Sequence, residues 1–495
     1  MNRSAGPGLV AVAVFAVALW AQSDALVGVF YDDGIYAVGA KALATGAGYR
    51  NIHLPDPIPM VHYPLLYPAA LSVLWRMWPA FPDNVALFAL FDAAALAAAA
   101  WIVTLHGRRL SGSSWVTPLA AGLGFTAFPL LTMVGMRLSE PLFLALAAGA
   151  VAVADRDRLS ARDALMAGVL AGLATLTRSI GVAFVAGVVA AAFIRGGPRR
   201  AGVAAGIVLA LVLPWMWWVV GQGQPGDPAL QANYGTYLSE ARQAGAGAML
   251  EGLDMRAMGA LGALALPTLP APLWYAAGLT LLVLVALGVA GAARTSPALL
   301  VGLGAYVLIV SVWPYPPHRF MWITVPWFGL LLAAGCRAAW GHRIRALRGV
   351  VVLAIALLVV GFGRRQATSL ATRGFAATPE GISQAFRVLV GSIQQETPAD
   401  AVIAVEDEAL VHLYTGRRTV PSYLFRWSGR GTEPLGSDTA LAFFCRSGVT
   451  HVALTGPAAQ TAPPVTGLLE RPDTTLMPLF RVTDGPALYR FRCPA

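Results

Sequence analysis

Two adjacent carboxylates, Asp32 and Asp33, follow the first long apolar run of the chain. An acidic pair at a membrane surface loses solvation energy, which makes such residues candidates for chemistry. An ionised carboxylate can take the proton of a hydroxyl group while that oxygen attacks a carbon atom. Neighbouring residues point in different directions, so we expect only one of the two to face a reacting centre. The alternative is structural, because an aspartate at this position can cap a helix.

Three arginines stand at the predicted outer ends of apolar runs: Arg137, Arg178 and Arg319. A guanidinium group binds phosphate oxygens in a bidentate way and keeps its charge when partly desolvated. Arginines that converge beneath an outer loop would suit the phosphate of a lipid-linked donor. Each one has an alternative role as an interfacial anchor or as the ion-pair partner of Glu140.

Two further side chains are candidates for substrate binding. Glu140 follows Ser139 and precedes Pro141 at a predicted helix start. It either stabilises the helix N-terminus or orients an arginine or an acceptor. His62, in the first outer loop, either contacts phosphate or lies in the membrane interface. The sequence contains no zinc-type Cys/His spacing, P-loop or dinucleotide-binding motif, so we expect no cofactor and no metal, although an acidic pair can bind a divalent ion.

The composition is that of a polytopic membrane protein. The chain of 495 residues is 57% hydrophobic and 12% charged, with a formal net charge of +10, whereas soluble domains carry about 25% charged residues. The arginines cluster in short loops between apolar runs and form no continuous basic stripe, so we expect no nucleic-acid partner. The lipid bilayer is the expected surrounding.

Apolar runs of spanning or near-spanning length predict about eleven transmembrane helices. They cover residues 9–29, 84–106, 115–135, 141–154, 164–178, 180–194, 201–220, 272–293, 297–313, 320–336 and 349–363. A cleaved signal peptide is an alternative for the first run. The predicted fold is thus an all-α membrane domain over 1–363, with a catalytic outer loop over 30–83.

The distribution of arginines predicts the orientation in the plasma (inner) membrane. With the N-terminus in the cytoplasm, the inner loops carry fourteen arginines, and the longer outer loops before residue 364 carry only eight basic residues. This bias follows the positive-inside rule. The acidic pair and the C-terminal region are then extracytoplasmic.

The last part of the chain differs in character. Strand-like runs at 401–405, 417–420, 449–454 and 487–492 alternate with short helical segments, which predicts a small extracytoplasmic α/β domain over 376–495. Cys445 and Cys493 lie in this region. In an oxidising compartment they form either a disulfide or two unpaired thiols.

Several short segments together resemble the GT-C class of integral-membrane glycosyltransferases, in particular the branch of protein O-mannosyltransferases and the lipid A aminoarabinose transferase. The matching segments are Asp32-Asp33, Tyr63-Pro64-Leu65-Leu66-Tyr67-Pro68, Leu138-Ser139-Glu140-Pro141-Leu142-Phe143, Leu176-Thr177-Arg178, and His318-Arg319-Phe320 before Val325-Pro326. They extend over about residues 1–335. The tail resembles this class only in being an extracytoplasmic α/β segment.

The resemblance implies an activity and roles for individual residues. The first acid of the pair, here Asp32, would be the general base, and Asp33 takes the place of its acidic neighbour. The class transfers sugar from a polyprenyl phosphate and inverts the anomeric centre. One departure concerns the aminoarabinose branch, which has a Lys-Pro-Pro loop where this chain has His62-Tyr63-Pro64. The Trp-Trp-Asp type of motif is absent too, since Val219 follows Trp217-Trp218.

The sequence therefore predicts an inverting glycosyltransferase that moves a sugar from a polyprenyl-phosphate donor to a hydroxyl acceptor on the outer face of the membrane. Asp32 would be the base, with Asp33 and Glu140 orienting the acceptor. The arginines would hold the donor phosphate, with His62 as a further candidate. The acceptor would be a protein, a lipid or a polysaccharide. A transporter or flippase, or a non-catalytic binder of lipid-linked saccharides, is the alternative.

Overall fold

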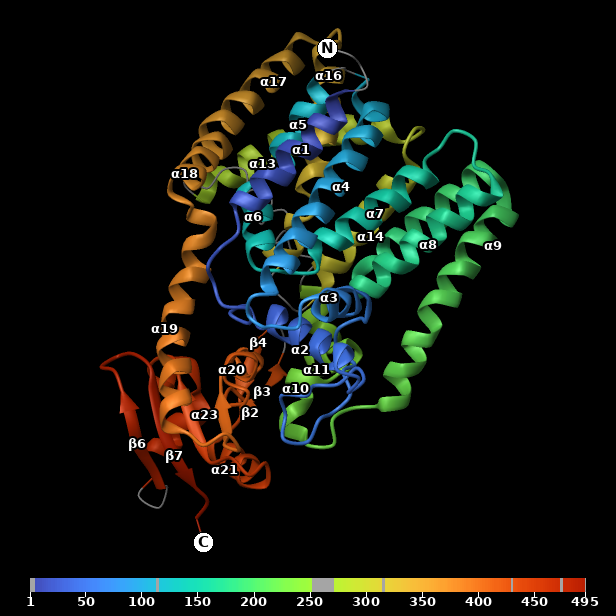
Figure 1. The fold of residues 1–495 in the computed structure, drawn as a ribbon. Helices are drawn as coiled ribbons and strands as arrows, with labels where there is room; N and C mark the ends of the chain where they lie inside the picture. The colour runs from blue at the N-terminus through green and yellow to red at the C-terminus, as the bar shows by residue number, and fades with distance from the viewer. Residues whose placement is uncertain are drawn as a thin grey trace. The chain divides into compact units, whose positions relative to one another are not determined.

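The computed structural model describes residues 5–112, 115–251, 271–313, 317–428, 431–471 and 475–494 (Figure 1). The chain forms two compact units, each built from three separate segments. Unit 1 comprises Met1–Gln22, Ala89–Met216 and Met249–Phe375. Unit 2 comprises Ser23–Phe88, Trp217–Ala248 and Ala376–Ala495. The predicted division at residues 363 and 376 stays a prediction.

Helices make up most of the chain before residue 397. They are α1 (Ala5–Trp20), α2 (Asp32–Ala44), α3 (Leu66–Met77), α4 (Val85–Ser111), α5 (Val116–Phe125), α6 (Phe128–Gly135), α7 (Glu140–Ala154), α8 (Ala161–Thr177), α9 (Val182–Gln222), α10 (Gln231–Tyr234), α11 (Tyr237–Glu251), α13 (Ala271–Ala292), α14 (Pro297–Val312), α15 (His318–Trp322), α16 (Val325–Trp340), α17 (Arg345–Leu358), α18 (Arg364–Thr372) and α19 (Gly374–Glu396). Short helical turns occur at Ser179–Gly181, Pro228–Leu230 and Val359–Gly363.

Within the described residues, three helical segments are long and apolar enough to cross a membrane: Val85–Ser111, Ser179–Gln222 and Arg345–Thr372. The bent pair α5 and α6 would make a fourth span if counted as one. Shorter apolar helices are Gly6–Trp20, Glu140–Ala154, Gly278–Ala292, Pro297–Val312 and Val325–Trp340. These helices fit a membrane protein, and the number of about eleven spans stays a prediction.

The first apolar run is shorter than predicted. Helix α1 ends at Trp20, and the polar residues Gln22, Ser23 and Asp24 follow it. The expected continuation through residue 29 is not helical. Asp32 and Asp33 therefore do not end the first helix but begin α2, twelve positions after the end of α1.

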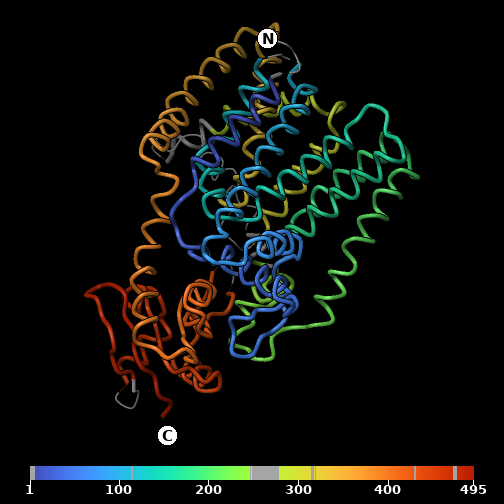
Figure 2. Tube along the Cα trace, in the orientation of Figure 1, coloured from blue at the N-terminus to red at the C-terminus, as the bar shows by residue number. Residues whose placement is uncertain are grey.

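The core of unit 1 depends on close contact between helix backbones. The helices α7 and α8 lie side by side in both views (Figures 1 and 2), as do α13 and α16 by their contacts. At the second pair a Cβ added to Gly335 would lie 1.7 Å from the Leu284 carbonyl oxygen. One added to Gly288 would lie 2.0 Å from the Leu331 carbonyl oxygen. Small residues allow this approach, as they commonly do between membrane helices.

Unit 2 contains a five-stranded sheet in the order β2-β1-β5-β7-β6. The strands are β1 (Val402–Val405), β2 (Arg418–Pro421), β5 (His451–Leu454), β6 (Thr475–Arg481) and β7 (Ala487–Arg492), and a separate hairpin pairs β3 (Phe425–Ser428) with β4 (Gly431–Pro434). Strand β1 is parallel to β2 and β5, whereas β7 is antiparallel to β5 and β6. The short helices are α20 (Glu408–Thr415), α21 (Ser437–Arg446), α22 (Ala458–Thr461) and α23 (Pro463–Leu469).

The core of unit 2 joins the segment before α2 to the C-terminal sheet. Leu26 and Val29 pack in one buried cluster with Leu389 of α19 and Ile403 of β1. A disulfide joins Cys445 of α21 to Cys493 after β7, which selects the bonded alternative for these two cysteines. The acidic pair is thus supported by residues far away in the sequence. The assignment of 376–495 as a separate extracytoplasmic domain stays a prediction.

The glycine contact between α13 and α16 gives a paired stability prediction. We expect Gly288→Ala to lower the thermal unfolding midpoint of the purified protein by several degrees, because the methyl group would meet the Leu331 carbonyl at 2.0 Å. Gly291→Ala on the same helix meets nothing within 4 Å. It should leave the midpoint unchanged or raise it, since alanine favours helix by up to about 1 kcal/mol. Equal effects of the two variants would contradict the packing argument.

Candidate active site

Asp32 has one carboxylate oxygen fixed by a tyrosine. The half-buried Asp32 begins α2, and its Oδ1 accepts a hydrogen bond of 2.6 Å from the Tyr63 hydroxyl. Burial, followed by the negative charge of Asp32, raises the pKa of Tyr63 well above its usual value. Tyr63 therefore keeps its proton near neutral pH and remains a donor. The arrangement holds the Asp32 carboxylate in one orientation.

Tyr63 is itself held by other aromatic rings. The buried Tyr36 lies four residues after Asp32 on α2, so both residues share one side of the helix. The Tyr36 ring makes edge contacts with Tyr63 and Tyr67, each at 5.1 Å between centroids. The Tyr-rich loop of the sequence thus forms a wall beside the candidate base.

Asp33 binds the turn that precedes it. Its Oδ2 accepts a hydrogen bond of 2.6 Å from the Gly28 amide, and its Oδ1 accepts one of 3.1 Å from the Phe30 amide. The two neighbouring aspartates thus contact different groups. The buried Asp33 closes the turn that leads into α2, and its predicted part in orienting the acceptor stays a prediction.

His62 lies against a second outer segment. Its Nδ1 is 2.9 Å from the Gly235 carbonyl oxygen and 3.4 Å from Oε1 of the buried Glu240. The imidazole also contacts the rings of Tyr63 and Tyr237, at 4.6 and 4.2 Å between centroids. These contacts fix the ring next to the tyrosine that binds Asp32. The predicted contact of His62 with donor phosphate stays a prediction.

In unit 1, two of the three predicted arginines share one carboxylate. Oε1 of Glu140 lies 3.0 Å from Nε and 2.9 Å from Nη2 of Arg319, and 3.1 Å from Nη1 of Arg178. The Arg178 Nη1 also donates to the Ser139 hydroxyl at 3.0 Å. Glu140 is 3% exposed. It contacts both guanidinium groups, and two cations on one anion leave a net positive charge. The predicted roles of Glu140, Arg178 and Arg319 in substrate binding stay predictions.

Arg137 takes a different position. Its backbone has a φ of +52°, in the left-handed region, and its Nη1 donates to the Gly135 carbonyl at 2.9 Å. The side chain is buried against its own turn. This contact differs from those of Arg178 and Arg319, and the predicted binding of phosphate by Arg137 stays a prediction.

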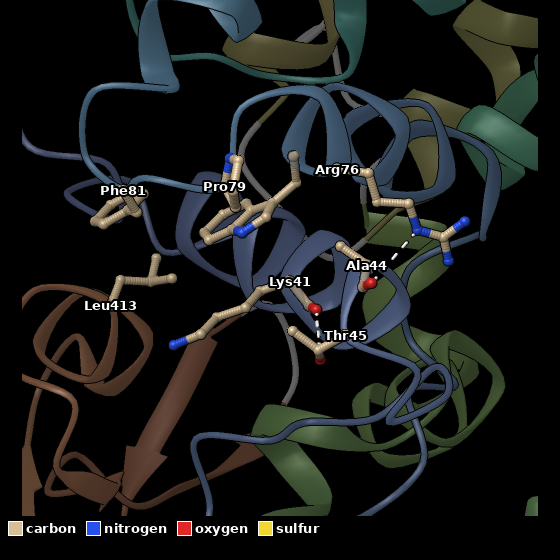
Figure 3. A pocket seen from close by; sticks show the side chains of 8 residues that line it. Lys41, Ala44, Thr45, Arg76, Pro79, Phe81 and Leu413 are labelled. Atoms are coloured by element: carbon tan, nitrogen blue, oxygen red, sulfur yellow. Dashed lines mark hydrogen bonds between the residues drawn. The ribbon is translucent and has the colours of Figure 1, made fainter.

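Unit 2 also contains a cavity of about 410 Å³ (Figure 3). Its lining residues include Lys41 and Arg76, and Trp75 stacks on Phe81 in its wall. The Lys41 ammonium lies 3.4 Å from His412 Nε2, while Arg76 donates to the Leu43 carbonyl at 2.8 Å. Figure 3 shows the two basic side chains extending in different directions. They therefore do not form one anion clamp.

The sequence analysis missed three buried polar residues near the start of α2: His53, Tyr234 and Glu408. Glu408 ends the run Glu406-Asp407-Glu408, which directly follows β1. The available signal was the run of three acids after a buried parallel strand, because ligand-binding residues often lie at the carboxyl ends of such strands. Among the described residues, no three His, Cys, Asp or Glu side chains are grouped to hold a metal ion. The expectation that none is required stays a prediction.

The Glu140 cluster gives a second stability prediction. We expect Glu140→Gln to destabilise the protein by about 3 kcal/mol, because removing one partner leaves buried charges without compensation. Asp157→Asn is the control: Asp157 is 86% exposed and pairs with Arg109 and Arg195 at 3.3 and 3.5 Å. An exposed pair contributes less than about 1 kcal/mol. Thermal unfolding of the purified variants measures both changes, and equal losses would contradict the assigned role of Glu140.

The structure of this chain is similar to solved structures of known proteins. No protein-family model matches the chain, and no curated protein matches it in sequence. The crystal structure of ArnT from Cupriavidus metallidurans bound to undecaprenyl phosphate is similar, with a TM-score of 0.55, 13% identity, and coverage of 98% of this chain and 97% of that one. Its apo form gives a TM-score of 0.57 at 13% identity, covering 98% and 96%.

A second solved protein agrees with the first. The oligosaccharyltransferase AglB from Archaeoglobus fulgidus, in complex with an inhibitory peptide and a dolichol-phosphate, is also similar. It has a TM-score of 0.53 and 13% identity over 98% of this chain and 74% of that chain. Both neighbours are GT-C glycosyltransferases. At this identity the likeness establishes the architecture, and the chain therefore has the GT-C fold.

Proposed function

We propose that this protein is an inverting glycosyltransferase. It would move a sugar from a polyprenyl-phosphate donor to a hydroxyl acceptor at the outer face of the plasma membrane. The likeness to ArnT bound to undecaprenyl phosphate supports this proposal because it extends over nearly the whole of both chains. AglB, in complex with an inhibitory peptide and a dolichol-phosphate, supports the binding of a lipid carrier of the same kind. The protein would lie in the plasma membrane, and its acceptor would be a protein, lipid or polysaccharide.

The observation that carries the proposal is the carboxylate of Asp32, fixed by Tyr63 at 2.6 Å in a half-exposed position. In the proposed step, Asp32 takes the proton of the acceptor hydroxyl. The acceptor oxygen forms a bond to the anomeric carbon, and the bond from that carbon to the phosphate oxygen breaks. The polyprenyl phosphate leaves with the electron pair. One displacement from the opposite side inverts the anomeric centre.

The leaving phosphate needs positive charge and no proton. Arg178 and Arg319 supply fixed guanidinium groups, and their shared contact with Glu140 orients them before substrate binds. Such preorganised donors stabilise the charge that develops on a leaving group. Arg137 and His62 remain proposed contacts of the donor.

An apolar cavity in unit 1 offers a place for the prenyl tail. It has a volume of about 1600 Å³, and its lining is mostly aliphatic and aromatic, from α5, α13, α14, α16 and α17. Representative lining residues are Leu281, Val307, Phe328 and Ile355. A branched hydrocarbon chain would lose water-exposed apolar surface there. Of the candidate ligands, the lipid carrier is the one whose chemistry suits such a surface.

The proposal is tested in cells of the source organism that lack this protein. We expect mass spectrometry of envelope glycans and glycolipids to show the loss of one sugar from one glycan. Wild-type protein should restore it, whereas Asp32→Asn at matched membrane levels should not, because an amide cannot accept the acceptor proton.

Asp56→Asn is the matched control, since Asp56 is an exposed carboxylate of the same outer loop. It should restore the glycan like the wild type. Full rescue by Asp32→Asn would exclude base catalysis by this residue and favour a transporter, flippase or non-catalytic binder of lipid-linked saccharides.

A further inference from the structure

The residue before the candidate base has an unfavourable backbone conformation. Tyr31 has a φ of +62° and is not a glycine. A side chain in this region costs about 1–3 kcal/mol and persists only where surrounding contacts impose it. The Tyr31 carbonyl accepts the Ile35 amide at 3.0 Å, so this conformation sets where α2 begins. The position of Asp32 therefore depends on whatever holds Tyr31.

Glu408 is one of the side chains that hold the Tyr31 hydroxyl, together with Tyr234 and Asn233. Its Oε1 accepts a hydrogen bond of 3.1 Å from the Tyr31 hydroxyl, across 377 positions of sequence. The same oxygen accepts the Tyr234 hydroxyl. Glu408 is 0% exposed. Its other oxygen, Oε2, accepts no hydrogen bond from any described residue.

The residues that follow Glu408 in α20 pack closely against the same turn. A Cβ added to Gly28 would lie 2.5 Å from Cβ of Leu410, and one added to Gly34 would lie 3.1 Å from Cβ of Ala409. The Thr419 hydroxyl donates to the Glu408 carbonyl at 2.8 Å. These contacts leave the turn and the start of α20 little freedom to separate. The carboxylate is thus presented to Tyr31 by a rigid support.

The second tyrosine on this carboxylate oxygen, Tyr234, is itself held by a histidine. The His53 Nε2 lies 2.8 Å from the Tyr234 hydroxyl, which in turn donates to Glu408. Because that hydroxyl has one proton, His53 must donate its Nε2–H to the Tyr234 oxygen. The chain His53, Tyr234, Glu408, Tyr31 is therefore continuous when the carboxyl group is ionised.

We propose that Glu408 is a positioning residue: its carboxylate holds Tyr31 in the positive-φ conformation and so fixes Asp32 at the start of α2. The C-terminal segment would then control the candidate base without touching substrate. The consequence for sugar transfer rests on the proposed function, whereas the effect on the turn does not.

The chemistry of Glu408 makes this restraint sensitive to protons. Burial raises the pKa of Glu408 to about 7. A proton placed on Oε2 leaves Oε1 a neutral acceptor, and both tyrosine hydrogen bonds lose their charge assistance. While Glu408 stays buried, its hydrogen bonds to Tyr31 and Tyr234 are therefore stronger above pH 7, where it is ionised, than below pH 7.

The two histidines nearest Glu408 do not titrate near neutral pH. Burial and the nearby His412 lower the pKa of His53 well below its usual value. Burial and the charge of Lys41 lower the pKa of His412 to about 4. Both imidazoles thus stay neutral at pH 7. Burial and the charges of Glu408, Glu406 and Asp33 raise the pKa of Asp407, and burial raises that of Glu406.

Amide hydrogen exchange on the purified full-length protein tests the proposal without any substrate. Peptides covering residues 28–35 report on the turn, and peptides covering β5 report on the rest of unit 2. We expect Glu408→Gln, which imitates the protonated acid, to raise exchange at 28–35 at least about tenfold at pH 8 and to leave β5 unchanged. This ratio corresponds to the loss of a charge-assisted hydrogen bond.

The pH dependence distinguishes positioning from general loosening. The exchange rates are first corrected for the pH dependence of intrinsic amide exchange. The corrected wild-type rate at 28–35 should then rise as the pH falls through 7, and Glu408→Gln should show no such rise. Tyr31→Phe should reproduce the Gln variant, and the double variant should add nothing to either. Glu406→Gln is the matched control, because Glu406 accepts the Thr455 amide at 3.1 Å instead. It should behave like the wild type.

Unchanged exchange at 28–35 in Glu408→Gln, or additive effects of the two substitutions, would overturn the proposal. The rescue of the glycan is measured separately in the deletion cells. Reduced rescue by Glu408→Gln and Tyr31→Phe would extend the positioning role to sugar transfer. Full rescue by Asp32→Asn together with the expected exchange data would refute the proposed function and leave the positioning of the turn established.

Discussion

The carboxylate of Asp33 closes the turn that leads into α2, and the position of Asp32 depends on that closure. Two backbone amides donate to Asp33, at 2.6 and 3.1 Å, and the turn they form brings Gly28 against α20. Once the turn is closed, the next residue back, Asp32, projects to Tyr63. One acid of the pair therefore builds the backbone that presents the other.

The two clusters described above use buried charge in opposite ways. In unit 2, the buried Glu408 accepts hydrogen bonds from two neutral tyrosine hydroxyls, and burial raises its pKa to about 7. In unit 1, Glu140 is outnumbered by Arg178 and Arg319. Two guanidinium groups around one carboxylate leave an excess of positive charge. The first arrangement can switch, whereas the second is fixed and suits binding of an anion.

Much of the local structure could be predicted from the sequence because it depends on local patterns. The apolar runs at 180–194 and 201–220 are the two parts of α9, which is kinked at Gly197 before Pro198. The strand-like runs at 401–405, 449–454 and 487–492 contain β1, β5 and β7. The predicted end of the first helix was wrong because the apolar residues on both sides outweigh Gln22, Ser23 and Asp24 in an averaged hydropathy.

The contacts of the candidate site could be predicted only in part. An ion pair between Glu140 and a nearby arginine was an open alternative, since the residues occur at facing helix ends. The contact between Tyr31 and Glu408 was not foreseen, because it joins residues 377 positions apart. The positive φ of Tyr31 was not foreseen either, since a tyrosine at this position does not indicate such a conformation. Both features come from tertiary packing in unit 2.

The most direct test of base-assisted single displacement is the stereochemistry of the transferred sugar. The lipid-linked sugar that accumulates in cells with Asp32→Asn can be isolated, and its anomeric configuration can be compared by NMR with that of the same sugar in the wild-type glycan. The proposed mechanism predicts opposite configurations on a polyprenyl-phosphate carrier. The same configuration in both molecules would contradict a single displacement with Asp32 as the base.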